Sequence, residues 1–379
     1  MELSLFMNEY QRHLYNNLMH LTTIGNTFYF QDFLLDDITY RIFNYRISSY
    51  TEFLNPSALE CRGHMFEVDR SGTLVRLAAL PMEKFHNLNE CPFTQNLDLS
   101  TVVAIEHKAD GSLISTFIHN GQLRVKSKGS LFSQQAADAM KYLDLPINTL
   151  FKQQLETITN TGITVNMEYV GPDNRIVLRY ATASTIVLNA RDTANGAYVS
   201  TDIFEHDNHH IECVNTNGLN LIQFVQTIPK MTESIEGFVL LLESGLRVKV
   251  KTDAYCALHH TKDSINNPRR LFECVVNEAS DDLLSLFATD QTAIDLIHDM
   301  QERVAVIYNH MVSYVEKFYD DNKHLDRKDY AIKGRAEIKP QIFFGLVMNL
   351  YLEKSNDYKD FCIKHYKDFG FRDETTADL

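Results

Sequence analysis

The hydrophobic pattern of the chain changes once, near Leu258, and this change constrains the fold more than any other feature. From Thr39 to about Lys251, short apolar runs are separated by turn residues, as is typical of strands. The Asn-Gly pair in "IHNGQL" is the strongest short signal for a hairpin, and "LLESGLRV" predicts another. The runs expected to form strands are 40–50, 64–69, 74–80, 115–127, 164–170, 175–181, 184–191 and 236–251, and helices are expected at 133–143 and 151–159.

The C-terminal part of the sequence has a helical period. Apolar residues recur there at steps of three and four, as on one face of an amphipathic helix, and "PQIFFGLVMNLYLEK" predicts a buried helix that begins at Pro340. A length of 379 residues favours two domains, although one domain stays open. We therefore expect an α+β chain, with an N-terminal domain of antiparallel sheets and flanking helices (1–258) and an all-α C-terminal domain (259–379). The periodic residues are Ile297, Met300, Val304, Ile307, Met311, Val315 and Phe318.

Composition and charge narrow the context and the partners. A net charge of -14 argues against indiscriminate coating of nucleic acid, since the phosphate backbone favours uniformly positive surfaces, but local basic grooves stay open. The six cysteines form no CxxC pair, which favours a reducing compartment and disfavours zinc. The sequence has no signal-peptide pattern and no membrane-spanning run, so we expect a cytoplasmic protein without membrane contact.

The stretch "AIEHKADGSLIS" places Lys108 where a predicted strand ends and the chain turns at Gly111. A lone Lys-x-Asp-Gly is more often a solvated turn than a catalytic site. However, Lys249 and Lys251 in "LRVKVK" stand two apart on a predicted strand, so their side chains point to the same side. Two inward lysines are costly unless a polyanion or carboxylates lie between them. The phosphates of a nucleotide would meet that condition.

Four motifs together resemble, in order and spacing, the nucleotidyltransferase motifs of covalent ligases and capping enzymes. Further stretches, "YRIFNYRISSYTEFLNPSALECRGHMFE", "LPMEKFHNLNE", "VKSKGSLFS" and "ASDDL", closely resemble the RNA ligase 1 family, the ATP-dependent tRNA-repair ligases of T-even-like bacteriophages. The likeness runs over nearly the whole chain. It implies an adenylyltransferase domain followed by a domain for tRNA specificity. The four motifs are Lys108-Ala-Asp110-Gly111, Glu168 in "NMEYV", Glu236-Gly237 in "IEGFVLL" and Lys249-Val-Lys251.

The resemblance implies a reaction in three steps. Lys108 attacks the α-phosphate of ATP, pyrophosphate leaves and a lysyl-AMP forms. The AMP then moves to an RNA 5′-phosphate, and a 3′-hydroxyl displaces it to close the phosphodiester. The attacking amine must first lose its proton, which from a reference pKa of about 10.4 costs roughly 4 to 5 kcal/mol at pH 7. The like charges of Lys249 and Lys251 are expected to favour that loss.

The resemblance also implies a role for each matching residue. Glu168 would hold the ribose hydroxyls, and Tyr255 matches a tyrosine that the family needs. The expected catalytic residues are thus Lys108, Glu168 and Tyr255. The expected nucleotide-binding residues are Tyr45, Arg62, Lys84, Lys128, Glu168, Glu236, Lys249 and Lys251, of which the first three would clamp the β- and γ-phosphates. Glu236, Asp281 and Asp282 would hold Mg²⁺, with Mn²⁺ as an alternative.

Several of these residues have a purely structural alternative. Tyr45 and Tyr255 are about as well explained as core aromatics. Arg62 has Glu60 and Glu67 close in sequence, and most arginines of this kind form an ion pair. These alternatives stay open from the sequence alone.

Two further clusters have ordinary explanations. Asp281 and Asp282 follow Ser280, as in the first turn of many helices, and this explanation weighs about as much as a metal site. The histidines of "EHDNHHIE" lack the HExxH spacing, so we expect a polar surface loop rather than a metal site. They are His206, His209 and His210.

The resemblance implies RNA with 5′-phosphate and 3′-hydroxyl ends as the substrate, in particular tRNA cleaved in its anticodon loop, and cooperation with a polynucleotide kinase/3′-phosphatase. Lys262, Arg269 and Arg270 are candidates for phosphate contacts, although a solvated charged face is the more common outcome. Two other functions stay open: another covalent nucleotidyltransferase, such as a DNA ligase or an mRNA guanylyltransferase, and a non-catalytic RNA-end-binding protein. The former usually carries an OB-fold after the last motif, whereas this chain turns helical.

Overall fold

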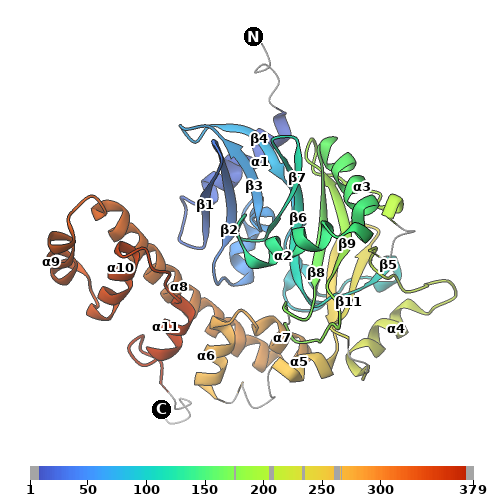
Figure 1. Ribbon diagram of the computed structural model, residues 1–379. Helices are drawn as coiled ribbons and strands as arrows, with labels where there is room; N and C mark the ends of the chain where they lie inside the picture. The colour runs from blue at the N-terminus through green and yellow to red at the C-terminus, as the bar shows by residue number, and fades with distance from the viewer. Residues whose placement is uncertain are drawn as a thin grey trace.

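The structure is a computed structural model of the chain. Three antiparallel sheets make up most of the first two thirds, and helices follow them (Figure 1). The predicted α+β class is therefore confirmed. The structure describes residues 8–174, 176–204, 209–232, 235–256, 265 and 267–372, and the helical backbone of 257–259.

The first sheet has four strands in the order β1-β2-β3-β4. The helix α1 (Glu9–Leu21) begins at Asn8, whose side chain accepts a hydrogen bond from the Tyr10 amide, and it packs Leu18 against the sheet. Leu18, Phe43 and Phe66 are fully buried between the two layers. The strands are β1 (Phe28–Leu35), β2 (Ile38–Tyr45), β3 (His64–Val68) and β4 (Leu74–Ala79).

The second sheet has five strands in the order β10-β9-β8-β6-β7, and the helices α2 and α3 pack on it. Asn120 and Gly121 join β6 to β7 with φ of 48° and 75°, as a tight hairpin turn with two left-handed residues requires. The predicted Asn-Gly hairpin is confirmed, and so are both predicted helices. The elements are β6 (Ser112–His119), β7 (Gln122–Ser127), α2 (Gln134–Leu143), α3 (Thr149–Asn160), β8 (Ile163–Val170), β9 (Ser184–Asp192) and β10 (Tyr198–Val199).

The third sheet has three strands in the order β12-β11-β5. Gly245, with φ of 83°, turns the chain between β11 and β12, so the second predicted hairpin is also confirmed. Ile105, Leu240 and Val248 form its buried face, against which α4 packs Val225. The elements are β5 (Val102–His107), α4 (Leu221–Thr227), β11 (Gly237–Leu242) and β12 (Arg247–Lys251).

One predicted strand is wrong, and one predicted helix is shorter than expected. The described part of 175–181 is irregular, because the amides of Val177 and Leu178 donate to the Asp110 carboxylate, at 2.8 and 2.6 Å, instead of to a neighbouring strand. The helix expected from Pro340 begins with a 3-10 turn, η9 (Gln341–Phe343), and continues as α10 (Phe344–Tyr351).

The long helix α8 (Gln291–Asn322) organises the C-terminal part. Six of its seven periodic apolar residues are buried, and Ile307 is half-buried against the same core. The helix also reaches the first sheet, since Asn309 Nδ2 donates to the Ile47 carbonyl at 3.0 Å and Arg46 pairs with Glu316 at 2.7 Å. The elements around it are α5 (Asp253–His259), α6 (Pro268–Val276), α7 (Ser280–Leu286), α9 (Arg327–Glu337), α10 and α11 (Tyr358–Lys364).

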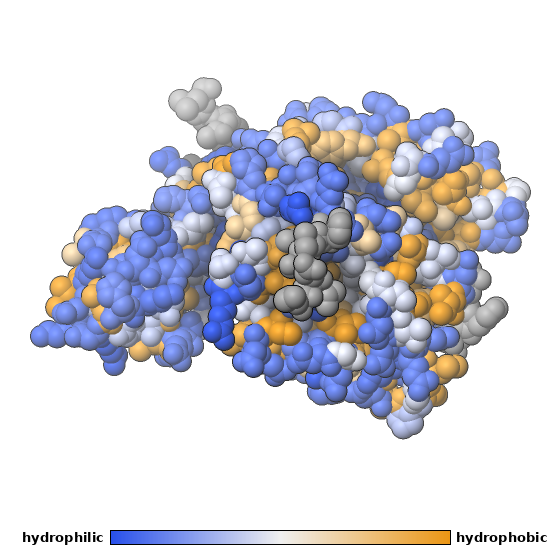
Figure 2. Space-filling model, turned by 90° about the horizontal axis from the view of Figure 1, so that it is seen from above, coloured by the Kyte–Doolittle hydropathy of each residue, from blue (hydrophilic) through white to orange (hydrophobic). Residues whose placement is uncertain are grey.

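The outer lobe of helices α8 to α11 presents a mostly hydrophilic surface in the view from above (Figure 2). Within the described ranges, every helix is too short or too polar to cross a bilayer. The division of the chain after residue 258 stays a prediction, and that position lies inside α5. The short 3-10 turns are η1 (Tyr50–Leu54), η2 (Ala58–Glu60), η3 (Pro92–Thr94), η4 (Leu99–Thr101), η5 (Pro146–Asn148), η6 (Asp202–Phe204), η7 (Ile228–Lys230) and η9.

Candidate active site

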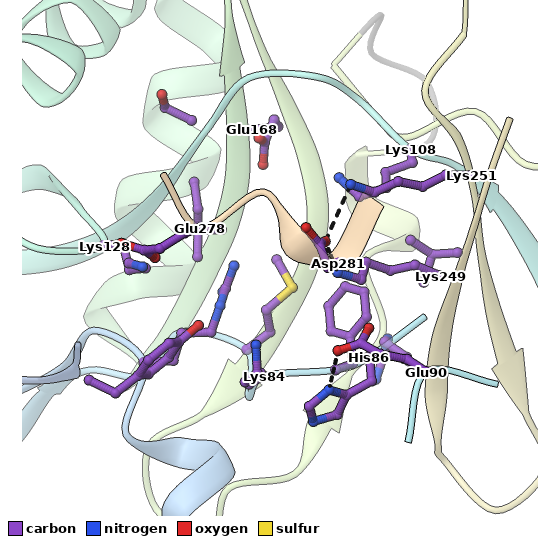
Figure 3. A pocket seen from close by; sticks show the side chains of 18 of the residues that line it. Lys84, His86, Glu90, Lys108, Lys128, Glu168, Lys249, Lys251, Glu278 and Asp281 are labelled. Carbon is purple, nitrogen blue, oxygen red and sulfur yellow. Dashed lines mark hydrogen bonds and ion pairs between the residues drawn. The ribbon is translucent and has the colours of Figure 1, made fainter. Parts of the chain in front are cut away.

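A cavity of about 520 Å³ lies where the second and third sheets meet α7 (Figure 3). Most of the residues singled out in the sequence line it, although they come from elements far apart in the chain. Glu236, Asp282 and Tyr255 are outside the lining but contact residues that belong to it. The predicted residues that line the cavity are Tyr45, Arg62, Lys84, Lys108, Lys128, Glu168, Lys249, Lys251 and Asp281.

Lys108 follows the last residue of β5 and points into this cavity. Its amide donates to the Gly237 carbonyl at 2.9 Å, and its Nζ lies 2.8 Å from Glu236 Oε2. The Lys108 side chain is 22% exposed and that of Glu236 is 4% exposed, so the carboxylate is buried and the amine is accessible. The solvated-turn explanation of Lys108 is therefore wrong.

Two glycines of the motifs allow this close approach of strands. A Cβ on Gly111 would lie 2.3 Å from the Tyr169 carbonyl oxygen, and one on Gly237 would lie 2.1 Å from that of Val250. Gly237 also has a φ of 145°, which other residues rarely adopt. Any side chain at either position would push apart the strands that place Lys108 and Glu236.

Asp110 fixes the turn after Lys108. Besides the amides of Val177 and Leu178, its buried carboxylate accepts a hydrogen bond from the Tyr255 hydroxyl at 2.8 Å. Tyr255 therefore contacts the support of the lysine rather than the cavity itself. This position is compatible with both interpretations of Tyr255, as a buried core aromatic and as a residue that the reaction needs.

Glu168 stands on β8 across the cavity from the lysines of β12 (Figure 3). Burial raises its pKa to about 7, although Lys108 acts in the opposite direction. A carboxyl group with such a pKa is present in both its protonated and its ionised form near neutral pH. It can accept hydrogen bonds from two hydroxyl groups once it is ionised.

Carboxylates lie between the two lysines of β12. Lys249 Nζ is 3.1 Å from Asp281 Oδ2, and Lys251 is 3.4 Å from both Asp281 and Glu236 and contacts Asp282. Burial alone would lower the pKa of Lys251, but Asp281, Asp282 and Glu236 raise it well above its usual value. Carboxylates therefore fill the space between these lysines, which is one of the two alternatives that the sequence left open. The like charges of Lys249 and Lys251 are expected to favour proton loss from Lys108, and Asp281, Asp282 and Glu236 are counterions that reduce this effect.

A cationic corner surrounds Tyr45 at the other side of the cavity. The Nζ atoms of Lys84 and Lys128 lie 5.2 and 5.1 Å from the centre of its ring. Burial would raise the pKa of Tyr45, but Lys84, Lys128 and Arg62 together lower it to about 8. This corner is suited to a strongly anionic ligand.

Arg62 brings its guanidinium to the same corner. Its expected partners are engaged elsewhere, because Glu60 binds Arg191 at 2.8 Å and Glu67 binds Arg76 at 2.7 Å. Arg62 Nη1 is buried and has no hydrogen-bond partner among the described residues. The ion-pair explanation of Arg62 is therefore wrong, and an anionic ligand would satisfy the group.

Comparison with known families decides the class of this site. Residues 60–255 match the family described as RNA ligase, and residues 262–369 match the family described as T4 RNA ligase 1, C-terminal domain. The chain belongs to the RNA ligase family. The predicted family and the predicted enzyme class are thereby confirmed.

Individual relatives of this RNA ligase are distant. A putative RNA ligase of Thermovibrio ammonificans is 24% identical over 307 residues, which cover 78% of each chain. A putative bifunctional polynucleotide kinase/RNA ligase of Autographa californica nuclear polyhedrosis virus is 25% identical over 191 residues, which cover 48% of this chain and 27% of the viral protein. An archaeal ATP-dependent RNA ligase of known structure matches with a TM-score of 0.47 and 12% identity. The match covers 94% of this chain and 96% of the archaeal chain.

The carboxylates of the ligase could hold a metal ion only together with phosphate oxygens and water molecules. Glu236, Asp281 and Asp282 converge on the ammonium of Lys251, and the described residues hold no group of three or more His, Cys, Asp or Glu side chains arranged for a metal. Mg²⁺ in proteins often takes only one or two carboxylates and completes its shell with water and phosphate oxygens. The donor set fits that pattern rather than an all-protein site.

The ligase site contains residues that the sequence did not single out. Glu278 comes from the turn between α6 and α7, lines the cavity and pairs with Lys359 at 2.7 Å, while Lys128 helps to lower its pKa against the effect of burial. His86 and Glu90 form a buried pair on the wall beside β12. The signal for this pair, a histidine and a glutamate four residues apart in "KFHNLNE", is too common to identify a site.

The remaining predicted clusters lie away from the cavity. His209 stacks on Phe151 with ring centres 4.0 Å apart, and His210 Nε2 contacts the Thr201 hydroxyl at 2.8 Å. Both are half-buried, and neither lines the cavity. Arg269 pairs with Glu273 at 3.1 Å on α6. Arg270 is exposed on the same helix, while His206 and Lys262 lie outside the described residues.

Proposed function

We propose that this RNA ligase joins 5′-phosphate and 3′-hydroxyl RNA ends with ATP as the adenylate donor, through a lysyl-AMP on Lys108 and an RNA-adenylate. The observation that carries the proposal is the Lys108 amine beside buried Glu236, in a cavity whose other walls hold lysines. A nucleophilic amine and a surface that stabilises phosphate charge are the two requirements of nucleotidyl transfer to lysine.

In the proposed first step, Lys108 Nζ forms a bond to the α-phosphorus of ATP. The bond from that phosphorus to the bridging oxygen breaks, and pyrophosphate leaves with the electron pair. Lys108 is held by Glu236 at 2.8 Å in the structure, so this ion pair must open and the ammonium must lose a proton before the attack. The lysines of β12 then stabilise charge at the α-phosphate.

The corner around Tyr45 is suited to the β- and γ-phosphates. Lys84, Lys128 and Arg62 supply cations there, and Arg62 can bind two oxygens at once. Glu168 on the facing strand would accept hydrogen bonds from the ribose hydroxyls. The nucleotide would thus span the cavity from β8 to the first sheet.

A divalent ion is part of the proposal. Glu236, Asp281 and Asp282 are the residues that would hold it, with Mg²⁺ preferred and Mn²⁺ as the alternative, and it would supply charge stabilisation at the transferred phosphate. When bound, it would replace Lys251 as the partner of at least one of these carboxylates.

For the RNA we propose a tRNA cleaved in its anticodon loop, healed by a polynucleotide kinase/3′-phosphatase and sealed in the cytoplasm. The match of 262–369 to a C-terminal domain of T4 RNA ligase 1 supports a role of the helical part in substrate choice. The viral relative, named as a kinase and ligase in one chain, supports the pairing of the two activities.

The proposal is tested by incubating the protein with α-labelled ATP and Mg²⁺, followed by denaturing electrophoresis. We expect a labelled band in the wild type and none in Lys108→Ala. Lys141→Ala, on the exposed face of α2, is the matched control and should label normally. Label with GTP instead of ATP, or label that persists in Lys108→Ala, would refute the assignment. Sealing of 5′-phosphorylated RNA should follow in the labelled enzyme.

A further inference from the structure

Lys126 on β7 is completely buried, although it carries a group that is normally charged. Most buried lysines pair with a carboxylate, because an ammonium is costly to remove from water. Within the described part of the chain, Lys126 Nζ makes no ion pair and donates instead to the backbone carbonyl of Gly63 at 2.7 Å. Burial and the charge of Arg62 lower the pKa of Lys126 to about 7, so the uncharged amine, which still donates, is well populated near neutral pH.

The bond from Lys126 to Gly63 is one of three hydrogen bonds that join three segments of the chain. The Gly63 amide donates to the Phe43 carbonyl at 2.7 Å, and Asn44 Nδ2 donates to the Lys128 carbonyl at 3.2 Å. The segments are 43–45 at the end of β2, 62–63 before β3 and 126–128 at the end of β7. Each segment is therefore bonded to the other two, and the three form a closed triangle.

Each of the three segments carries one residue of the cationic corner. Tyr45, Arg62 and Lys128 line the cavity, at the side where Figure 3 shows Lys128. Lys126 and Gly63 lie behind this lining and are not part of it. Lys126 therefore acts on the ligand-binding residues from the protein side, and Gly63, to which it donates, directly follows Arg62 in the chain.

The contact between 62–63 and 126–128 leaves little space for movement. A Cβ on Gly63 would lie 2.6 Å from the Lys128 carbonyl oxygen, and the φ of 89° at Gly63 is one that other residues rarely adopt. Gly63 is buried, and a buried carbonyl without a donor is costly. Removal of the Lys126 donor would therefore be relieved by a shift of the segment that carries Arg62.

We propose that Lys126 is a positioning residue for the β- and γ-phosphates of ATP, which holds Arg62 in place through the Gly63 carbonyl without touching the substrate. The inference rests on the proposed function. An uncharged donor suits this place, because Lys84, Lys128 and Arg62 already surround the corner with positive charge. A lysine of purely structural importance would affect every step of the reaction alike, whereas a positioning residue matters only while these phosphates are bound.

The test compares two steps that differ in these phosphates. Transfer of AMP to Lys108 uses ATP, whereas sealing of a pre-adenylated RNA strand without ATP begins after pyrophosphate has left. Lys126→Met keeps the length and the apolar stem of the side chain but removes the donor. We expect the KM for ATP in label incorporation to rise about 10-fold with little change in kcat, and kcat/KM for sealing of the pre-adenylated strand to stay within about 2-fold of the wild type.

Lys126→Gln restores an uncharged donor on a shorter side chain, so its KM for ATP should lie between those of the wild type and Lys126→Met. It tests the same selectivity if circular dichroism shows that Lys126→Met is unfolded. Lys141→Met, on the exposed face of α2, is the control and should match the wild type in both steps. An unchanged KM for ATP in the folded variants, or an equal loss in both steps, would overturn the proposal.

A double-mutant cycle tests the route through Arg62. Arg62→Gln should raise the KM for ATP by itself, because it removes the cation that binds the β- and γ-phosphates. Adding Lys126→Met to Arg62→Gln should then change the KM by less than about 2-fold, since the residue that Lys126 positions is gone. A further rise of about 10-fold in the double variant would show that Lys126 acts independently of Arg62 and would refute the proposal.

The two proposals fail in different ways. If the wild type takes no label from ATP and seals no RNA, the proposed ligase function fails. If the wild type labels and seals but Lys126→Met shows no selective rise in the KM for ATP, only the role of Lys126 fails.

Discussion

The carboxylate of Asp281, in the first turn of α7, lies 3.1 Å from the ammonium of Lys249 on β12. The same carboxylate is 3.4 Å from Lys251. Burial would raise the pKa of Asp281, but the two lysines lower it well below its usual range, so it is ionised. A residue of the helical part thus supplies the negative charge that a nucleotide phosphate would bring to these lysines.

Removing this charge should strengthen ATP binding when no divalent ion is present. In Asp281→Asn the lysines lose one anionic partner, and a change of about 1 kcal/mol corresponds to about 5-fold tighter binding. The measurement is calorimetric titration with ATP in the presence of EDTA. Asp299→Asn, at an exposed position of α8, is the control. Unchanged or weaker binding by Asp281→Asn would show that the carboxylate does not compete with phosphate.

Glu236→Gln should lower the rate of Lys108 adenylation by about 100-fold or more. The substitution removes the buried charge that pairs with Lys108 and Lys251, and electrostatic groups at a reacting centre are typically worth a few kcal/mol. The rate is followed as label incorporated from α-labelled ATP. Glu243→Gln, exposed in the turn after β11, should label like the wild type. Full incorporation by Glu236→Gln would show that the carboxylate is dispensable.

Two features near this site could be predicted from local patterns, whereas the roles of its residues came from the resemblance to the RNA ligase 1 family. Period-two apolar runs and the Asn-Gly turn predicted the hairpins, and the spacing of Lys249 and Lys251 on one strand placed both side chains on one face. What the sequence could not show is how charges pair across elements. Asp281 contacts lysines that are about thirty residues away, and whether a carboxylate or a ligand fills the space between them is a property of the packed structure.

The two failures on single segments have the same origin. Residues 175–181 have strand-like side chains, yet Asp110 binds two of their amides, and a carboxylate about seventy residues away leaves no local trace. Arg62 looked like an ion-pair partner of Glu60, but Glu60 is held by Arg191 and His64 instead. In both cases a distant residue competes successfully for the local partner.

The raised pKa of Glu168 predicts a dependence of stability on pH. Because burial raises this pKa from about 4.5 to about 7, the folded state binds a proton that the unfolded state has lost between these values. The contribution of Glu168 to stability is therefore fully present below about pH 4.5 and is lost as the pH rises through about 7. Glu168→Gln cannot ionise, so its free energy of unfolding lacks this pH dependence. The free energy of unfolding of the variant minus that of the wild type should therefore be up to about 3 kcal/mol larger at pH 8 than at pH 4.5.

Denaturant unfolding at several pH values between 4.5 and 8 measures this difference. Glu243→Gln, at an exposed position after β11, is the control for the loss of one carboxylate. A constant difference between Glu168→Gln and the wild type over this range would contradict the assignment of the raised pKa to Glu168.

Tyr255→Phe should slow adenylation without changing the affinity for ATP. The variant loses the 2.8 Å hydrogen bond to Asp110, which holds the turn after Lys108, while the cavity lining keeps its composition because Tyr255 is not part of it. We expect a loss of about 1 kcal/mol in stability, a fall of about 10-fold in kcat for label incorporation and an unchanged KM for ATP. Tyr319→Phe, half-buried on α8, serves as the control. A rise in KM with unchanged kcat would instead place the Tyr255 hydroxyl in contact with the nucleotide.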